Sequence, residues 1–336
     1  MVSGIGTRKV AIPDGLFPTF TLYHLRFHLE LGARRHTLPA YLGSTVRGVF
    51  AASFRQVVCV TRAPVCDGCL LLPHCPYPYI FETPPTLSLA VALQKRFQQA
   101  PRPYVFEVPM VYDGAETLEL GLMLVGKASD FLPYFVYVVQ ATGTQGLGRA
   151  RVPYRLLSVT DGGQAEHPLL FQAESGMVRD QVQGITLADM RHPDDGQVQH
   201  ITLECLTPLR IKKYGSYQGS GARLEFATLL DLLLGRLEAL SLFHCAATWA
   251  PHTALREAAR QVRVLDKHLA FQSLERYSNR QHQKLPLHGI VGRISFAGEL
   301  GPFLPLLRLG EYVHLGAGTA FGLGQYRLTT TTASAV

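Results

Sequence analysis

The feature that most constrains the fold is an ending that occurs twice along the chain. The segments "LPYFVYVVQATGTQGLGRARVPYRL" (132–156) and "PFLPLLRLGEYVHLGAGTAFGLGQYRL" (302–328) both run from a helix-like stretch through a glycine loop to a strand carrying Y-R-L. They lie about 175 residues apart, which is too long a period for a solenoid of small repeats. We therefore expect two related domains, each closed by the same device.

Hydrophobic periodicity predicts the elements of each half. In the first half it indicates a strand over 16–31, a helix over 41–57, two strands near 102–126 and a helix or buried segment over 130–143, before the final strand. In the second half it indicates a strand over 200–211, an amphipathic helix over 223–245, a strand over 289–300, a short helix over 303–313 and a last strand over 325–332.

This order predicts an α+β protein of two tandem ferredoxin-like (RRM-like, βαββαβ) domains. We expect the N-terminal domain over 1–165, a linker over 166–198 and the C-terminal domain over 199–336, with its glycine-rich loop at 316–324. The length of 336 residues and an apolar content of 47% suffice for two cores.

Charge indicates the class of partner. Lys and Arg number 32 against 25 Asp and Glu, which gives a net charge of +7 and favours a polyanionic partner. The sequence has neither an initial signal peptide nor an apolar run of about 18 residues, so we expect a cytoplasmic protein with no membrane partner.

Four cysteines crowd into a segment at 59–85 that is rich in turn residues. Cys59, Cys66, Cys69 and Cys75 have the spacing C-x6-C-x2-C-x5-C, and four thiolates make a closed tetrahedral zinc site. We expect structural Zn²⁺ in this insertion of the first domain and no cofactor for catalysis. Disulfides, free thiols and an iron–sulfur cluster are the alternatives, and the spacing alone does not separate zinc from a cluster.

Several motifs, in this order along the chain, carry a family resemblance. They are "LPAYLGSTVRGVF", "CPYPYIFETPP", "LTPLRIK", "RYSNRQ", "LHGIVGRISF" and the final "GAGTAFGLGQYRL". The chain resembles the CRISPR-associated RAMP superfamily, specifically the endoribonucleases that cut precursor CRISPR RNA within its repeats. The resemblance implies two ferredoxin-like domains side by side, RNA bound along a positive cleft and face, and the glycine-rich loop as the superfamily's signature. Related members act only as RNA-binding subunits of effector complexes, and that is the alternative function here.

The implied chemistry is metal-independent cleavage by the RNA's own 2′-hydroxyl. It leaves a 2′,3′-cyclic phosphate and a 5′-hydroxyl, and we expect the protein to stay bound to the product. Such a reaction needs a base, an acid and positive charge on the phosphate. His36 in "GARRHTLPAY" lies where the family often has its active histidine, and Tyr41 follows it. Arg280 and His282 in "ERYSNRQHQKLPLHG" are the rival catalytic candidates.

Basic residues near these motifs and the loop glycines are the expected RNA contacts. The expected partners are CRISPR repeat RNA and the mature crRNA, with other CRISPR effector-complex proteins as further candidates. The predicted RNA-binding residues are Arg34, Arg35, Arg47, Arg149, Arg151, Arg210, Lys212, Lys213, Arg276, Tyr277, Lys284, Gly316, Gly318, Gly322 and Gly324.

Overall fold

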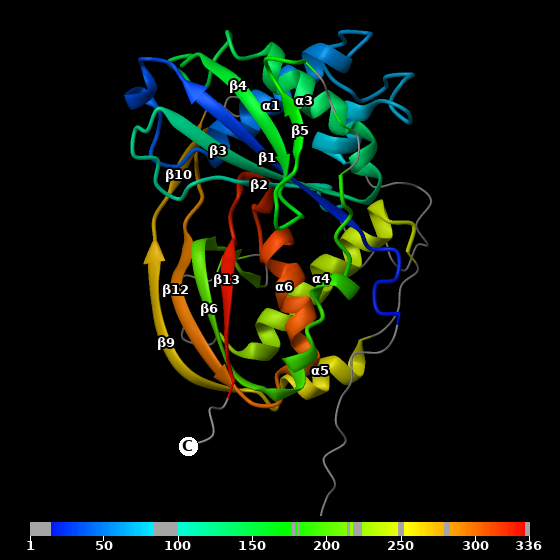
Figure 1. Cartoon of the computed structure of the whole chain (residues 1–336), viewed down its shortest axis with the longest axis vertical. Helices are drawn as coiled ribbons and strands as arrows, with labels where there is room; N and C mark the ends of the chain where they lie inside the picture. Colours follow the sequence, from blue (N-terminus) through cyan, green and yellow to red (C-terminus); the bar gives the residue numbers. More distant parts are fainter. Residues whose placement is uncertain are drawn as a thin grey trace, which may run out of the picture.

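A computed structural model describes residues 15–83, 100–176, 179, 182–213, 216–217, 224–247, 252–278 and 283–332. The protein is a mixed α+β structure built on two antiparallel main sheets, one above the other in Figure 1, each with its own helices. Among these residues, no helix is both long enough and apolar enough to cross a membrane.

The first unit has a five-stranded sheet with the order β2-β3-β1-β4-β5. β1 lies in the middle and pairs antiparallel with both β3 and β4. The fifth strand, β5, comes from the segment predicted as a linker. The elements in chain order are β1 (Leu22–Leu31), α1 (Gly43–Val58), β2 (Tyr104–Glu107), β3 (Thr117–Val125), α3 (Leu132–Ala141), β4 (Tyr154–Asp161) and β5 (Leu169–Gln172).

The second unit has a four-stranded sheet with the order β13-β6-β12-β9. As in the first unit, the first strand lies between the third and the fourth. The sequence patterns missed β9, because most of its residues are exposed or half-buried and leave no clear apolar alternation. The elements are β6 (Val198–Leu209), α4 (Phe226–His244), α5 (Thr253–Ala259), β9 (Arg263–Gln272), β12 (Gly289–Ala297), α6 (Leu304–Val313) and β13 (Tyr326–Thr332).

Short elements join these units. The strands β10 and β11, on either side of 279–282, pair antiparallel as a hairpin. The short strands are β7 (Lys212–Lys213), β8 (Ser216–Tyr217), β10 (Glu275–Ser278) and β11 (Gln283–Pro286). The 3-10 and π-helical turns are η1 (Arg35–Thr37), η2 (Pro78–Glu82), η3 (Gly126–Phe131), η4 (Ala188–Met190), η5 (Pro193–Gln197), η7 (Gly301–Phe303) and η8 (Thr319–Phe321).

The repeated endings start alike in three dimensions. α3 and α6 both begin with Leu-Pro, and a proline in the first turn costs no backbone hydrogen bond because its missing N–H has no partner there. Both helices bury their apolar face against the sheet of their own unit. Each is followed by a glycine loop and then by a strand that pairs with the first strand of its own sheet, β4 with β1 and β13 with β6. The internal repeat of the sequence is therefore a repeat of structure.

The two units pack against each other through shared apolar contacts. One core gathers under the first sheet against α1 and α3. The other core lies between the second sheet and α4 and α6, and it also includes Leu22, Met123 and Val125 from the first sheet. Because these side chains are at most 1% exposed, the relative placement of the units is fixed by burial.

Candidate nucleic-acid interface

A large cleft lies where the two units meet. It has a volume of about 1340 Å³ and is lined by the N-terminal half of α1, the first glycine loop and the β10–β11 hairpin. Four basic residues line it, while Glu275 is its acidic member and pairs with a lysine of the hairpin. The basic residues are Arg149, Arg151, Arg276 and Lys284. A cleft of this size with cationic walls suits an extended polyanion better than a small molecule.

An aromatic ring beside the cleft is held between two arginines. The guanidinium carbon of Arg276 lies 4.7 Å from the ring centre of Phe321, and that of Arg47 lies 5.6 Å from it. Both distances are within cation–π range. Burial lowers the pKa of Arg276, and the nearby positive charges of Arg47 and Arg210 lower it further. The structure therefore brings Arg47 and Arg276, which are far apart in the sequence, to one phenylalanine ring.

Sequence reasoning missed Phe321. It lies within "GAGTAFGLG", and the only signal was a single aromatic residue among glycines. Arg47 also has a notable environment, because its Nε is buried and has no hydrogen-bond partner among the described residues. Buried donors of this kind are usually satisfied.

Tyr41 connects the N-terminal unit to the C-terminal glycine loop. Its hydroxyl donates a hydrogen bond of 2.5 Å to the carbonyl oxygen of Phe321. Burial raises the pKa of Tyr41 well above its usual value, so the phenol keeps its proton at neutral pH. In this arrangement the Tyr41 proton is already engaged by the loop, and the side chain positions Phe321 beside the arginines.

The glycines of the C-terminal loop serve close packing inside the protein. All four that were predicted to bind RNA have φ between +73° and +86°, where only glycine is unstrained. A Cβ on Gly324 would lie 1.8 Å from the carbonyl oxygen of Leu315, and one on Gly322 would lie 2.9 Å from that of Phe106. These contacts explain the glycines without RNA, so RNA contact by this loop stays a prediction.

His36 lies at the rim of the cleft. It is exposed in η1, and the neighbouring residues Thr37 and Pro39 line the cleft. Arg34 reaches the carbonyl oxygen of Arg151 at 3.5 Å. The preceding loop therefore touches the cleft wall on the side of the first glycine loop.

Arg35 was also predicted to bind RNA, but its side chain contacts residues of the protein outside the cleft. Its Nε donates to the carbonyl oxygen of Gly114 at 3.0 Å, and its Nη2 pairs with Glu116 at 2.8 Å. These contacts hold η1 against the turn before β3. The charge of Arg35 is thus largely balanced by a neighbouring carboxylate.

Comparisons with known proteins agree with this architecture. Residues 203–326 match the family model CRISPR_Cas6, the CRISPR-associated endoribonuclease Cas6. Residues 20–183 match AF_1859_N, an N-terminal domain. The second unit is thus similar to the Cas6 endoribonuclease family.

Three solved structures resemble the whole chain in fold. A Cas6 product complex superposes with a TM-score of 0.53 and 17% identity, covering 92% of this chain and 100% of that one. Thermus thermophilus Cas6 gives the same TM-score and identity, with 92% and 99% coverage. A partial Cas6-RT-Cas1–Cas2 complex gives a TM-score of 0.52 at 16% identity, covering 94% of this chain and 48% of that one.

A curated relative spans nearly the whole chain as well. It is an uncharacterized protein of Archaeoglobus fulgidus, 24% identical over 316 residues, which cover 92% of this chain and 99% of the relative.

The remaining predicted site residues come from two segments of the chain, 277–282 and 210–213. Arg280 and His282 lie outside the described residues, in the connection between β10 and β11, and those strands border the cleft. Arg210 is buried at the end of β6, next to the C-terminal glycine loop. Lys212 and Lys213 form β7, and Tyr277 lies in β10; for these three the structure describes the backbone position alone.

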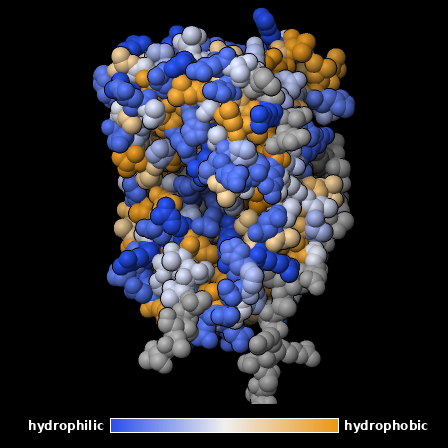
Figure 2. Space-filling view, in the orientation of Figure 1, coloured by the Kyte–Doolittle hydropathy of each residue, from blue (hydrophilic) through white to orange (hydrophobic). Residues whose placement is uncertain are grey.

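A second, smaller cavity lies between the units and contains none of the predicted site residues. It has a volume of about 260 Å³ and is bordered by β1, β2, α6 and β13. His24 is buried there with its Nε2 3.4 Å from Oε2 of Glu107. Burial alone would raise the pKa of Glu107, but His24 lowers it overall. Figure 2 shows mainly hydrophilic residues around the hollow between the units on this face.

The four clustered cysteines lie away from the large cleft, on the connection from α1 to η2. All four are free thiols of intermediate exposure, and they line one small cavity. Within the described part of the chain, no three His, Cys, Asp or Glu side chains already have the arrangement of a metal site. Zinc binding stays a prediction.

Proposed function

We propose that this protein is an endoribonuclease that cuts precursor CRISPR RNA within its repeats to give mature crRNA. The observation that carries the proposal is the large cationic cleft, where the η1 loop with His36, the arginine–Phe321 stack and the β10–β11 hairpin come together. The match of residues 203–326 to the Cas6 endoribonuclease family supports RNA as the polyanion.

The proposed reaction is an attack of a 2′-hydroxyl on the adjacent phosphate, with no metal in the chemistry. The new bond from the 2′-oxygen to phosphorus forms as the bond to the 5′-oxygen breaks, which gives a 2′,3′-cyclic phosphate and a 5′-hydroxyl. His36 is the proposed proton-transfer group, since imidazole both accepts and donates protons near neutral pH. Its exposure on η1, next to Thr37 at the edge of the cleft, supports this role.

Positive charge would stabilise the phosphate as its negative charge increases in the transition state. Arg47 and Arg276 are the proposed source, since their side chains meet at Phe321 beside the cleft. Tyr41 would act as a positioning residue for Phe321 through its hydrogen bond to the loop. Arg280 and His282, in the hairpin connection, are the rival proton-transfer and charge-stabilising pair.

Two further parts of the proposal concern the fold and the partners. The shared strand order of the sheets supports a duplicated ferredoxin-like fold, which presents one RNA-binding cleft between its halves. A similar Cas6 structure is a product complex, which supports retention of the cleaved RNA here. Another contains Cas1–Cas2, which supports other CRISPR proteins as partners.

The test incubates the purified protein with its cognate repeat RNA in EDTA, beside His36→Ala. The matched control is His268→Ala, because His268 is exposed on β9 and pairs with Asp266, away from the cleft. We expect cyclic-phosphate ends, read by mass spectrometry, from the wild type and the control. His36→Ala should bind RNA normally and cleave it at least about a hundredfold more slowly.

Other outcomes overturn parts of the proposal. Full cleavage by His36→Ala moves the proton transfer to Arg280 and His282. Tight binding without any cleavage by the wild type makes the protein an RNA-binding subunit. Circular dichroism in EDTA checks that the protein stays folded in each sample.

A further inference from the structure

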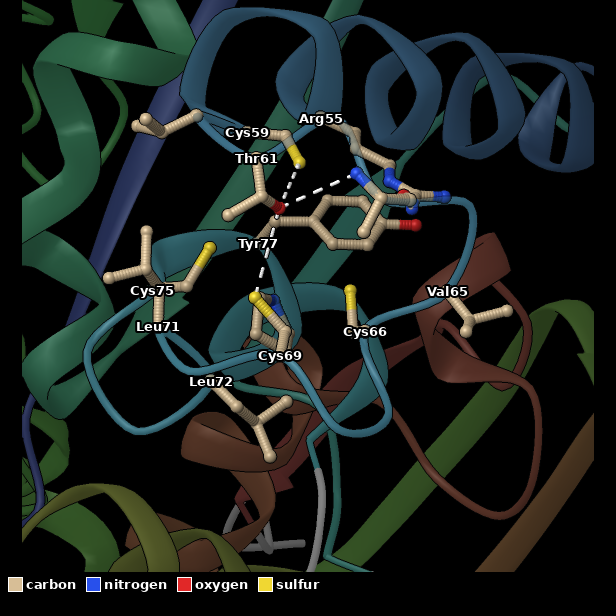
Figure 3. Close-up of a pocket in the computed structure, with 13 residues that line it drawn as sticks. Arg55, Cys59, Thr61, Val65, Cys66, Cys69, Leu71, Leu72, Cys75 and Tyr77 are labelled. Carbon is tan, nitrogen blue, oxygen red and sulfur yellow. Dashed lines mark hydrogen bonds between the residues drawn. The ribbon is translucent and has the colours of Figure 1, made fainter.

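The four-cysteine segment is the motif that RNA cleavage does not explain. Its four thiols line one cavity between the end of α1 and η2, with a volume of about 20 Å³. A space of this size holds one water-sized particle. Figure 3 shows the sulfur atoms of Cys59, Cys66, Cys69 and Cys75 directed toward the space between them. A single ion therefore fits where a further side chain would not.

The residues around the cavity already have the local geometry of a metal-binding turn. Cys66 and Cys69 are joined by a turn in which the backbone N–H of Cys69 donates to the carbonyl oxygen of Cys66 at 3.1 Å. Gly68 supplies φ of +73° within that turn. A Cys-x-x-Cys turn of this kind gives two adjacent thiolates to one ion.

A threonine hydroxyl contacts two of the four thiols. The Thr61 hydroxyl lies 3.9 Å from Cys59 Sγ and 3.8 Å from Cys69 Sγ, so it bridges two of the four thiols. In a tetrahedral site with bonds of about 2.3 Å, neighbouring sulfurs lie about 3.8 Å apart. An ion bound by Cys59 and Cys69 would therefore take the place of the Thr61 hydroxyl between their sulfurs.

Burial does not hold this segment in place. Three of its large apolar side chains point into solvent: Leu70 is 94% exposed, Val60 82% and Val65 62%. Figure 2 shows a hydrophobic cluster at the top right, where Figure 1 draws this part of the chain. Between Cys59 and Cys75 the chain forms turns and bends, with no strand or α-helix. A segment that buries so little needs another source of order.

One cation is already positioned for the charge of a thiolate site. The Arg55 side chain lines the cavity from α1, and its guanidinium lies 5.4 Å from the ring centre of Tyr77. Its Nη2 donates to the carbonyl oxygen of Ala63, which fixes the guanidinium over the segment. Four thiolates around a divalent ion carry a net charge of −2, and Arg55 partly offsets it.

We infer that Cys59, Cys66, Cys69 and Cys75 bind one Zn²⁺ as four thiolates. Binding releases four protons from the thiols, involves no electron transfer and leaves no open coordination position, so the ion is structural. This inference does not rest on the proposed RNA cleavage, because metal binding is measured without RNA.

The site would fasten the end of α1 to η2, and η2 contacts the second unit. The Tyr79 hydroxyl of η2 lies 3.1 Å from Nδ1 of His244 in α4. The cleft lies along the N-terminal half of the same helix α1. The metal would therefore stabilise the contact between the two units near the C-terminal end of α1.

The test measures metal directly in the full-length protein, purified from zinc-supplemented medium without a metal-affinity tag. Mass spectrometry of the elements should find one zinc per chain in the wild type. Cys66→Ser with Cys69→Ser should lose it. The matched control is Cys205→Ala with Cys245→Ala, which removes the two buried thiols outside the segment and should keep one zinc.

A second readout does not depend on whether the variants fold. Replacement of zinc by Co²⁺ in the wild type should give the intense near-ultraviolet and visible bands of a tetrahedral thiolate site. Chelation at neutral pH should then expose four additional thiols to a thiol reagent and speed protease cleavage within 59–77.

Three results overturn the inference. The first is a wild-type protein that has no stoichiometric zinc and does not take up Co²⁺, with all four thiols freely reactive. The second is stoichiometric iron and sulfide with a brown chromophore. The third is disulfides found by mass mapping of the unreduced protein.

Discussion

The Tyr41 hydroxyl donates a 2.5 Å hydrogen bond to the carbonyl oxygen of Phe321, 280 residues further along the chain. The same loop carries the ring on which Arg47 and Arg276 stack. One contact between the units thus fixes the position of the arginines beside the cleft. It also explains Gly43, where a Cβ would lie 1.9 Å from that carbonyl oxygen.

Tyr41→Phe should remove the hydrogen bond that joins the segment before α1 to the C-terminal glycine loop. Loss of one hydrogen bond costs about 1 kcal/mol of unfolding free energy. The control is Tyr112→Phe, since the Tyr112 hydroxyl donates to Ala115 within its own unit at 2.6 Å. Both variants should be destabilised similarly in urea titrations, but only Tyr41→Phe should bind or cleave RNA more weakly. Equal RNA activity in the two variants contradicts the positioning role.

Phe321→Ala should remove the ring that Arg47 and Arg276 contact. Each cation–π contact contributes about 0.5–1 kcal/mol, so loss of both should weaken RNA binding roughly five- to thirtyfold. Phe271→Ala is the control, because Phe271 is a half-exposed ring on β9 that packs on His288 instead. Filter-binding titrations at fixed salt compare the three proteins. An unchanged Kd for Phe321→Ala rules out the stack as part of the RNA site.

The cleft arginines should determine the salt dependence of RNA binding. Arg149→Gln with Arg151→Gln should reduce the slope of log K against log salt by roughly 0.7 for each RNA phosphate that the protein no longer neutralises. Arg155→Gln should leave the slope unchanged, since Arg155 on β4 pairs with Glu30 at 3.0 Å. Affinities measured between about 50 and 300 mM salt, over which the Debye length changes roughly twofold, provide the measurement. Equal slopes for all three proteins would falsify the cationic cleft as the binding surface.

Two buried histidines should make the protein less stable in mild acid. Burial lowers the pKa of His244 and of His314 to about 4, so both are neutral in the folded state, whereas an unfolded histidine titrates near 6.5. The unfolded state therefore binds more protons below about pH 6.5. This stabilisation is complete above that pH and decreases as the pH falls to about 4.

A variant isolates the contribution of His244. Its Nε2 donates to the carbonyl oxygen of Pro101 at 2.7 Å, so Nδ1 accepts from the hydroxyl of Tyr79. His244→Gln can keep both contacts without titrating. Between about pH 6 and 4.5, its unfolding free energy should change by about 1.4 kcal/mol per pH unit less than that of the wild type. Parallel curves from urea unfolding would count against a depressed pKa for this histidine.

Gly324→Ala should strongly destabilise the C-terminal loop. Its φ is +73°, and a Cβ would lie 1.8 Å from the carbonyl oxygen of Leu315, so backbone has to move. We expect the unfolding free energy to fall by about 2–4 kcal/mol. Gly235→Ala is the opposite case, since Gly235 lies within α4 with nothing within 4 Å of its Cβ, and it should gain about 0.5–1 kcal/mol. Thermal melts of both variants measure the change in melting temperature. Equal changes for the two variants would contradict the steric explanation for Gly324.

The sequence alone predicted most of the local structure. Apolar periodicity located α1, α4 and α6 and most strands, because amphipathic elements repeat every 3.6 or 2 residues wherever one face is buried. The duplicated ending predicted two related units, and in both sheets the first strand lies between the third and the fourth. The edge strand β9 was missed since its side chains are largely solvated and leave no such pattern. The predicted linker likewise supplies β5, a four-residue strand too short for a periodic signal.

Only the tertiary structure determined which side chains meet. His36, Tyr41 and Arg47 were picked from one short stretch, and local sequence was enough to place them near the start of α1. No pattern in the sequence joined them to Phe321 or to Arg276, since pairings between residues so distant along the chain depend on how two cores pack together. The glycines of the last loop show the same division. The number of glycines predicted a backbone with positive φ. The tertiary packing brings the carbonyl oxygens of Leu315 and Phe106 so close that a Cβ would clash with them.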